Sequence, residues 1–519
     1  MLNNKLSGVD VCFLIASSAK KSYQKLSEIY SAIEPPTWAL LLAQSCRSIG
    51  FKVNIVDANV ENLSHQEILT RINELNPKIV CLVVYGQNVN AGTTNMRGAI
   101  DITNFLKLNK ISCPIAFIGS HVQALPIQSL KKEKNIDIVF TNEGVYALRN
   151  LLKLDNFSSD KLKNIKGIAY RDGSEIKINS PEKVVPTERM DIDLPGYAWD
   201  LLPYKEHPLD LYRSPMWHAE YDFEKRSPYA SLQTSLGCVF KCDFCMINLI
   251  NRNDTEQIGV AANYSNMRFW STNFIIKEFD KLIQMGVKTI RIVDEMFLLN
   301  PKYYVPLCEE LAKRNKDDEL RMWSYSRIDT VKRPEILKLV RKAGIKWLCL
   351  GIESGEKSVR LEVAKGKFED VDVREVIKKV HAADINVMAN YIFGLPGDTR
   401  ETMKKTFDLS LELCTTGWNT YAAMALPGSQ LYKNAVEKNY KLPNSYEGYS
   451  FHSYETQPLP TETLKPEEIL EYRDKSFNNY HIHKPFLNKV EKKFGKKAIE
   501  NIKEMTKINL KRKILGHSR

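Results

Sequence analysis

The chain has 519 residues, of which 43% are hydrophobic and 26% are charged, and this is ordinary usage for a globular protein. At about 100–200 residues per domain, such a length predicts about two to four domains with sizeable cores. No stretch approaches the roughly 20 apolar residues of a membrane span, and residues 1–10 lack the apolar segment of a secretory signal. Ten cysteines are too few for a disulfide framework at this length. We therefore expect a cytoplasmic, reduced protein.

The positive charge is concentrated at the C-terminus. The formal net charge is +12, and residues 484–519 contain twelve Lys and Arg against three Glu. A solvated face that closes the bottom of the preceding domain is the first interpretation of this tail. Contact with an anionic membrane surface or a lipid-linked substrate is the second. Nucleic-acid binding comes last, because the tail lacks the interleaved aromatic side chains that stack on bases.

Residues 9–153 alternate apolar strands with amphipathic helices. This alternation predicts a parallel sheet with helices on both faces, and hence a flavodoxin-like or Rossmann-like α/β domain. Ligands on such sheets bind at the carboxyl ends of the strands. The loops expected at that edge are 85–90, 119–121 and 141–144, and the predicted strands are 9–16, 53–56, 79–84, 115–118 and 136–140.

A second strand–helix alternation begins near residue 229 and predicts a partial parallel barrel, in which catalytic groups come from the carboxyl ends of the strands. Its six predicted strands are 230–234, 289–293, 321–325, 347–351, 387–393 and 418–425.

The remaining segments connect or follow these two units. Residues 167–178 predict a hairpin with its turn at Asp172-Gly173, and a linker rich in Pro and Tyr follows. The last segment predicts helix, because Leu487, Val490, Phe494, Ala498, Ile502 and Met505 keep a spacing of three to four. The predicted domains are 1–155 (α/β), 156–227 (hairpin and linker), 228–430 (partial barrel) and 431–519 (helical and basic).

The strongest chemical signal is a group of three cysteines directly after the first barrel strand. Cys238, Cys242 and Cys245 have the spacing CxxxCxxC. A 4Fe–4S cluster usually takes four thiolates, so three on one loop leave one iron open to another ligand. Zinc is the alternative, but structural zinc usually takes four ligands from two paired elements, and no second Cys or His pair is near in the sequence. The remaining cysteines are expected to be small buried hydrophobes.

This loop, with Phe244 before its last cysteine, resembles the radical S-adenosylmethionine (SAM) superfamily. The resemblance implies that the amino and carboxylate groups of SAM chelate the open iron. It also implies that an electron from the reduced cluster cleaves the sulfonium. The resulting 5′-deoxyadenosyl radical would remove hydrogen from an unactivated C–H bond.

Other strand ends match the same superfamily pattern. Asp294 and Glu295 stand where the superfamily places acceptors for the methionine amino group, and a solvated loop pair is the alternative. Arg327 follows the third barrel strand and is expected either to pair with a substrate carboxylate or to form a structural ion pair.

Two further segments complete the expected SAM site. Glu353 resembles the residue that accepts the ribose hydroxyls, a charge-assisted contact, and a charge at a helix N-terminus is the alternative. Gly394, in a segment that resembles the fifth strand end, would permit close approach of the backbone to adenine. The predicted SAM-binding residues are Phe244, Asp294, Glu295, Arg327, Glu353 and Gly394.

The N-terminal domain narrows the family. Residues 34–40, 50–57, 119–121 and 137–144 resemble the cobalamin-binding domain of cobalamin-dependent radical enzymes. The DxHxxG loop is absent, so the resemblance implies a cobalt without a histidine lower ligand. As a separate hypothesis, Tyr85 or Gln87 faces that side of the cobalt. The residues expected to contact cobalamin are Tyr85, Gln87, Asn88, Gly119, Ser120, His121, Asn142, Glu143 and Gly144.

One departure from the family pattern leaves an alternative open. The family loop often reads GEGE, and Tyr146 occupies the position of its second Glu. A degenerate domain that no longer binds cobalamin is therefore the alternative.

The family resemblance implies methylation of an unactivated carbon. One SAM would methylate cobalamin, a second would be cleaved at the cluster, and the substrate radical would take the methyl group. The expected partners are a small-molecule or lipid-linked substrate and a reductase, flavodoxin or ferredoxin as electron donor. A cobalamin-dependent cyclase or rearrangement enzyme without methyl transfer is the first alternative.

Two more distant alternatives remain. A methylthiotransferase would need a second cluster on Cys12, Cys46 and Cys81, whose predicted positions in mid-strand and on a helix do not converge on one loop edge. A non-enzymatic cobalamin sensor would need neither the cysteine group nor Glu353.

Overall fold

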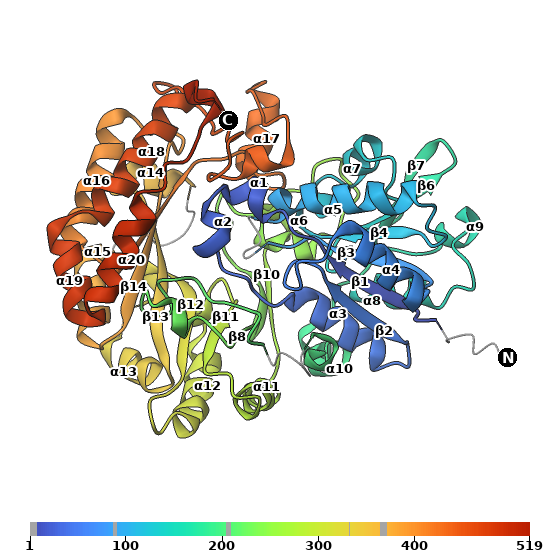
Figure 1. The fold of residues 1–519 in the computed structure, drawn as a ribbon, viewed down its shortest axis with the longest axis horizontal. Coiled ribbons are helices and arrows are strands. Elements are labelled where there is room, and N and C mark those ends of the chain that lie inside the picture. Colours follow the sequence, from blue (N-terminus) through green and yellow to red (C-terminus); the bar gives the residue numbers. More distant parts are fainter. Residues whose placement is uncertain (1–7, 87–90, 204–208, 332, 364–370, 519) are drawn as a thin grey trace.

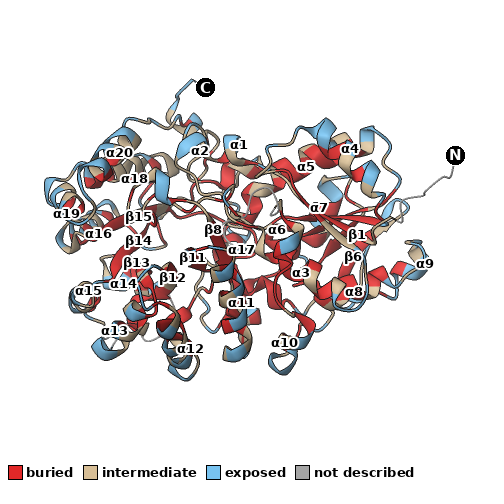
Figure 2. Cartoon of the chain, turned by 60° about the horizontal axis from the view of Figure 1, so that its bottom comes forward, coloured by how far each residue is buried: buried red, intermediate tan, exposed pale blue. Residues whose placement is uncertain are grey.

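The computed structural model describes residues 8–86, 91–203, 209–331, 333–363 and 371–518. Two α/β units lie side by side, the N-terminal unit on the right of Figure 1 and the barrel unit on the left. Buried strands run through both units, and the covering helices turn their exposed faces outward (Figure 2). Within these ranges, no helix combines the length and hydropathy that a bilayer crossing requires.

The N-terminal unit is built on one seven-stranded sheet with the order β2-β1-β3-β4-β5-β6-β7. The first five strands are parallel, which confirms the predicted flavodoxin-like arrangement. The predicted hairpin, β6 and β7, extends this sheet antiparallel, with Ile138 opposite Tyr170. The strands are β1 Val11–Ile15, β2 Val53–Asp57, β3 Ile79–Val83, β4 Ile115–Ile118, β5 Ile138–Phe140, β6 Ile168–Asp172 and β7 Glu175–Ile178.

Helices cover both faces of this sheet, because the longer ones carry an apolar stripe toward the strands. Two short helices, α1 and α2, leave the sheet and lie between the two units in Figure 1. The helices are α1 Ala19–Tyr23, α2 Leu26–Ile29, α3 Thr37–Arg47, α4 His65–Leu75, α5 Gly92–Leu108, α6 Ser120–Ala124, α7 Pro126–Lys132, α8 Val145–Leu152 and α9 Ser159–Leu162.

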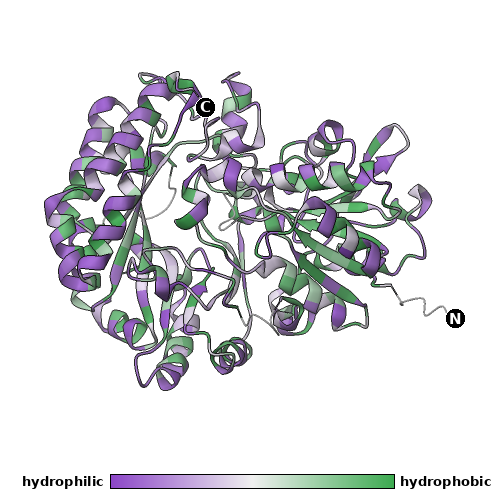
Figure 3. Ribbon diagram, in the orientation of Figure 1, coloured by the Kyte–Doolittle hydropathy of each residue, from purple (hydrophilic) through white to green (hydrophobic). Residues whose placement is uncertain are grey.

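The second unit is a partial barrel of six parallel strands in the order β15-β14-β13-β12-β11-β8. All six predicted strands are present, and Figure 3 shows apolar stretches among the strands of the molecule and mixed apolar and polar residues along the surrounding helices. The strands are β8 Tyr229–Leu232, β11 Thr289–Ile292, β12 Arg321–Arg327, β13 Ile345–Glu353, β14 Asn386–Phe393 and β15 Gly417–Ala422.

Helices follow the barrel strands on the outside, as a strand–helix alternation predicts. A short helix, α10 Met190–Asp193, lies in the linker before them. The barrel helices are α11 Thr272–Gln284, α12 Pro301–Arg314, α13 Pro334–Lys342, α14 Lys357–Val363, α15 Val373–Ala382 and α16 Arg400–Leu413.

The C-terminal region is helical but interrupted. The predicted helix face from Leu487 to Met505 is divided at Gly495, whose φ of 87° and ψ of 176° take the backbone out of the helix. Only glycine adopts such a conformation without strain, so one amphipathic pattern becomes two helices. The helices of this region are α17 Gln430–Glu437, α18 Pro466–His481, α19 Lys484–Phe494 and α20 Lys496–Thr506.

Candidate active site

The cysteine group lies on a loop that a small antiparallel ribbon holds in place. The ribbon pairs β9 Ser235–Cys238 with β10 Asn266–Phe269, an element that the sequence did not predict. Gly237 has a φ of 83°, and a Cβ there would lie 2.1 Å from the backbone oxygen of Asn266. Glycine is therefore required one residue before the first cysteine, where the two strands approach closely.

All three cysteines line one cavity of about 460 Å³. Burial raises the pKa of the Cys238 thiol to about 11 and that of Cys242 to about 12. A buried thiolate is costly unless a cation compensates its charge, and iron supplies that charge when a cluster binds. The donor set therefore fits a 4Fe–4S cluster held by Cys238, Cys242 and Cys245.

A single metal ion fits this site poorly. In the described ranges, no three His, Cys, Asp or Glu side chains are arranged around one ion. Zinc would need such an arrangement, with about four ligands. In a cluster, each thiolate binds an iron of its own, so the cysteines need not converge on one point.

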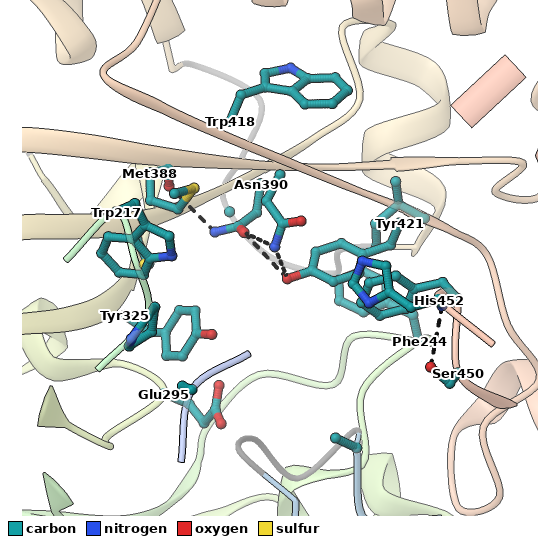
Figure 4. A pocket seen from close by; sticks show the side chains of 18 of the residues that line it. Trp217, Phe244, Glu295, Tyr325, Met388, Asn390, Trp418, Tyr421, Ser450 and His452 are labelled. Atoms are coloured by element: carbon teal, nitrogen blue, oxygen red, sulfur yellow. Dashed lines mark hydrogen bonds between the residues drawn. The ribbon is translucent and has the colours of Figure 1, made fainter. Parts of the chain in front are cut away.

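The side chains that line this cavity come from alternate residues of the barrel strands. Every second residue of β12, β13 and β14 faces the lumen, because successive side chains of a strand point to opposite faces. Figure 4 shows this interior, with Tyr325, Met388 and Asn390 around the open space. The lining residues from these three strands include Trp323, Tyr325, Arg327, Cys349, Gly351, Glu353, Met388, Asn390 and Ile392.

Two carboxylates at the cysteine end of the cavity are open. Glu295 and Glu353 line it, and among the described residues neither carboxylate has a hydrogen bond or ion pair. Burial is the main cause that raises the pKa of each to about 7. Half-buried carboxylates of this kind are poised to accept hydrogen bonds from a ligand. They fit the predicted contacts to the amino group and the ribose hydroxyls of SAM, which stay predictions.

Of the other predicted SAM contacts, Asp294 and Arg327 have partners within the chain, and Phe244 lines the cavity. Asp294 accepts hydrogen bonds from the backbone and hydroxyl of Thr234, both at 2.6 Å, and from the hydroxyl of Ser235 at 2.5 Å. Arg327 forms a bidentate ion pair with Asp329 at 2.9 and 2.6 Å, which is the structural pair that we considered. Phe244 lines the cavity beside the cysteines.

Gly394 lies away from the cavity wall. Its backbone N–H donates to Asp398 at 2.9 Å, and a Cβ there would meet the side chain of Ile469 at 2.7 Å. In this structure the glycine allows a close contact with helix α18, and an approach to adenine stays a prediction.

A second cavity, of about 300 Å³, lies at the carboxyl edge of the N-terminal sheet. Its walls come from the ends of β1 and β3 and from the barrel loops that carry Gln233 and Asp294. The side-chain oxygen of Gln233 is buried without a hydrogen-bond partner in the described chain. Such an atom can accept a hydrogen bond from an amide-rich ligand, so this cavity fits the amide substituents of cobalamin.

Tyr85 is the predicted cobalamin contact that lines this second cavity. Its hydroxyl accepts a hydrogen bond from Gln123 at 2.6 Å, and its ring lies edge-on to Trp38 at 5.8 Å. Gln87 and Asn88 lie outside the described residues.

The other predicted cobalamin contacts line neither cavity and pack inside the protein. Glu143 pairs with Arg268 of the barrel unit at 2.7 Å, and both side chains are at most 2% exposed. Asn142 donates to the backbone oxygens of Glu182 and Arg252. The remaining residues of this group are Gly119, Ser120, His121 and Gly144, of which Ser120 and His121 are buried.

Several residues of the site were not predicted from the sequence. Arg291 of β11 reaches into the barrel, where its Nη1 donates to both carboxylate oxygens of Glu34, at 2.7 and 2.6 Å. Tyr325, Asn390 and His452 line the cavity as well. Side chains alternate between the two faces of a strand, and this alternation places Tyr325 and Asn390 on the inward face. His452 lies on a loop, where no such alternation exists.

The three cysteines that a methylthiotransferase would need lie inside two strands and a helix and not together on one loop. Cys12 and Cys81 lie in β1 and β3 and belong to different apolar clusters on opposite faces of the sheet. Cys46 lies in α3, and burial raises its pKa to about 12. The geometry therefore agrees with the expectation that these are buried structural cysteines.

The basic C-terminal helices close the bottom of the barrel. Phe486 and Val490 of α19 and Ile502 of α20 are fully buried. Lys489 donates to the backbone oxygen of Cys414 at 2.6 Å, and Lys493 pairs with Asp384 at 3.1 Å. Part of the basic charge thus fastens the helices to the barrel, as the first interpretation of the tail expects.

The comparisons with known proteins agree with this arrangement. The family model of the radical SAM superfamily matches residues 232–410, and that of the B12 binding domain matches residues 30–152. An anaerobic magnesium-protoporphyrin IX monomethyl ester cyclase from Cereibacter sphaeroides is 25% identical over 86% of this chain, which spans about two thirds (66%) of the cyclase. An uncharacterized methyltransferase from Pyrococcus horikoshii is 24% identical over 82% of this chain and 83% of its own length.

A solved structure shares the fold over most of the chain. It is the radical SAM methyltransferase TsrM from Kitasatospora setae, with cobalamin and a [4Fe-4S] cluster bound. The TM-score is 0.63 at 14% identity, and the match covers 90% of this chain and 88% of TsrM. The chain therefore combines a B12 binding domain with a radical SAM domain after it, which is the domain combination of a cobalamin-dependent radical SAM enzyme, and its cofactors are a 4Fe–4S cluster, SAM and cobalamin.

Proposed function

We propose that this enzyme methylates an unactivated carbon of a small molecule. The observation that carries the proposal is the wall shared by the two cavities. Glu34, Ala91, Ile247 and Glu295 line both of them. A substrate at this junction would therefore lie within reach of the cysteine loop on one side and the edge of the N-terminal sheet on the other.

When bound, the cluster with SAM supplies a carbon-centred radical, and cobalamin supplies a methyl group. Cys238, Cys242 and Cys245 would hold the cluster. Glu295 would accept the amino group of SAM, and Glu353 its ribose hydroxyls. The aromatic and aliphatic walls would exclude water, which limits side reactions of a reactive intermediate.

An external donor, which is a reductase, a flavodoxin or a ferredoxin, must supply the electron. The cysteine loop reaches the surface at Val239, which is 48% exposed, and at the exposed Lys241. A donor could approach the cluster there. Because α19 and α20 pack on the barrel, we leave membrane contact and a lipid-linked substrate out of the proposal.

Cyclisation or rearrangement without methyl transfer is the second candidate function. The relative from Cereibacter sphaeroides, which matches most of this chain, is named as a cyclase. The two candidates require the same cofactors and the same shared cavity wall, so the fate of the methyl group distinguishes them.

The test uses anaerobically reconstituted enzyme, a reductant and SAM with a deuterated methyl group. A small-molecule extract of the source organism serves as the substrate pool, and mass spectrometry follows new products. Methylation predicts a product that carries the deuterated methyl group and both 5′-deoxyadenosine and S-adenosylhomocysteine as by-products. A new product without the label, formed with 5′-deoxyadenosine alone, would contradict methylation and favour the second candidate.

A further inference from the structure

Both of the described cationic side chains that line the cavity with the cysteines already pair with carboxylates of the chain. In the described part of the chain, only two cationic side chains line it, Arg291 and Arg327. Arg291 is 1% exposed and paired with Glu34, and Arg327 is paired with Asp329. Phosphate and carboxylate groups are usually bound by such arginines. Diverting Arg291 to a substrate would leave the buried carboxylate of Glu34 uncompensated, which is strongly unfavourable.

The cavity offers no further carboxylate for a cationic substrate either. Glu34 is already paired, and Glu295 and Glu353 are the groups that the proposed function assigns to SAM. The lumen beyond them is therefore electrically balanced.

The walls of this lumen are aromatic and come from three parts of the chain. Trp323 of β12 contacts Trp217 of the linker and Tyr325, with ring centroids 5.0 and 5.1 Å apart. Opposite them, Tyr421 of β15 lies edge-on to Phe451 at 4.7 Å, as Figure 4 shows for Tyr421 beside the 450–452 loop. Flat apolar surfaces of this kind bind ring-containing or hydrocarbon ligands.

The polar groups in the same lumen are neutral. Asn419 donates hydrogen bonds to the hydroxyl of Tyr421 at 2.5 Å and to the side-chain oxygen of Asn390 at 3.4 Å. The Nδ1 atom of His452 is buried with no hydrogen-bond partner among the described residues. Burial lowers the pKa of His452 well below its usual value, so its imidazole is uncharged near neutral pH.

We infer that the substrate is an uncharged, largely apolar, ring-containing molecule with a hydrogen-bonding group, bound between Tyr325, Asn390 and Tyr421 against the 450–452 loop. This inference rests on the proposed function, because the substrate must share the cavity with SAM. None of the Lys and Arg side chains described in residues 484–518 lines the cavity, although Met505 of α20 does.

Binding can be tested without turnover. The enzyme carries its cluster, cobalamin and SAM but receives no reductant, and equilibrium dialysis measures binding of N-phenyl-1-naphthylamine and of inorganic pyrophosphate. The naphthylamine should bind, and pyrophosphate should neither bind nor displace it. Met388→Trp fills the lumen and should weaken naphthylamine binding by about tenfold or more. Lys503→Gln, on the exposed face of α20, is the matched control and should leave binding unchanged.

A second variant keeps the test valid if Met388→Trp fails to fold. Tyr421→Phe removes one hydroxyl and should weaken naphthylamine binding by about threefold. Pyrophosphate binding, or naphthylamine binding that neither variant alters, would overturn the inference. Since no methyl transfer takes place in this assay, its failure leaves the methylation test unaffected, and loss of methyl transfer leaves the dialysis result intact.

Discussion

The cysteine loop and the strand-end loops of the N-terminal sheet follow the same architectural rule but use it differently. Both lie at the carboxyl ends of parallel strands, where ligands bind in α/β folds. At the barrel, Cys238, Cys242, Cys245 and the two open carboxylates all face one cavity. At the N-terminal sheet, Asn142 and Glu143 turn to the linker and barrel instead.

The difference teaches that position at a strand end does not by itself assign a residue to a ligand. A cluster needs several thiolates at a short spacing, so its ligands are fixed by covalent chemistry. A loop that meets a second unit must also satisfy buried polar groups at that contact. Glu143 serves this purpose, because it accepts from the backbone of Val185 at 2.6 Å and pairs with Arg268.

The largest expected effect is at the cysteine loop. Cys242→Ala should abolish iron binding and 5′-deoxyadenosine formation, because only two thiolates would remain. Iron analysis and the optical spectrum of the reconstituted protein measure the first, and chromatography measures the second. Cys414→Ser, at the end of α16, should retain iron and activity. If both variants lost iron, the result would contradict the assignment of the cluster to this loop alone.

Glu143→Gln tests whether Glu143 stabilises the contact between the two units and does not bind cobalamin. It leaves the buried Arg268 without its charge partner and should destabilise the protein by about 3–5 kcal/mol. Thermal unfolding measures the loss, with Glu412→Gln as the control, because its exposed pair with Arg374 should contribute about 0–1 kcal/mol. If Glu143→Gln instead kept its stability and lost only cobalamin from its optical spectrum, Glu143 would be a cofactor contact.

Glu353→Gln should weaken SAM binding by about 1.5–3 kcal/mol, the range for hydrogen bonds to a charged group. Its thermal stability should stay near that of the parent protein, because the side-chain carboxylate of Glu353 has no hydrogen bond or ion pair in the described chain. Equilibrium dialysis with labelled SAM measures the affinity. Gly394→Ala should show the reverse pattern, with normal SAM binding and lower stability, because the added Cβ meets Ile469 at 2.7 Å.

The smallest expected effect concerns pH. Burial raises the pKa of Asp57, at the end of β2, to about 6, against a lowering contribution from the Tyr212 hydroxyl at 2.9 Å. At this one site the folded protein binds more protons than the unfolded chain between about pH 4 and pH 6, so the contribution of Asp57 to the free energy of unfolding falls as the pH rises through this window and levels off above it. Asp57→Asn should reduce that fall by about 1–3 kcal/mol. Unfolding temperatures of both proteins at several pH values measure the difference, and parallel curves would contradict this assignment.

The sequence by itself determined the two α/β units, all six barrel strands and the cysteine group. The spacing of apolar residues predicts strands and helices, because their repeats of two and 3.6 residues follow from local backbone geometry. The spacing of Cys238, Cys242 and Cys245 likewise predicts a cluster, because a cluster takes its ligands from one short segment.

Only the tertiary structure decided which strand-end residues face a cavity and which join the units. The pair of Glu34 with Arg291 spans 257 positions along the chain, and His452 reaches the lumen on an irregular loop. Gly495 divides the last amphipathic pattern into two helices, although the pattern itself continues. Such contacts depend on how separate elements pack, and no local repeat encodes that packing.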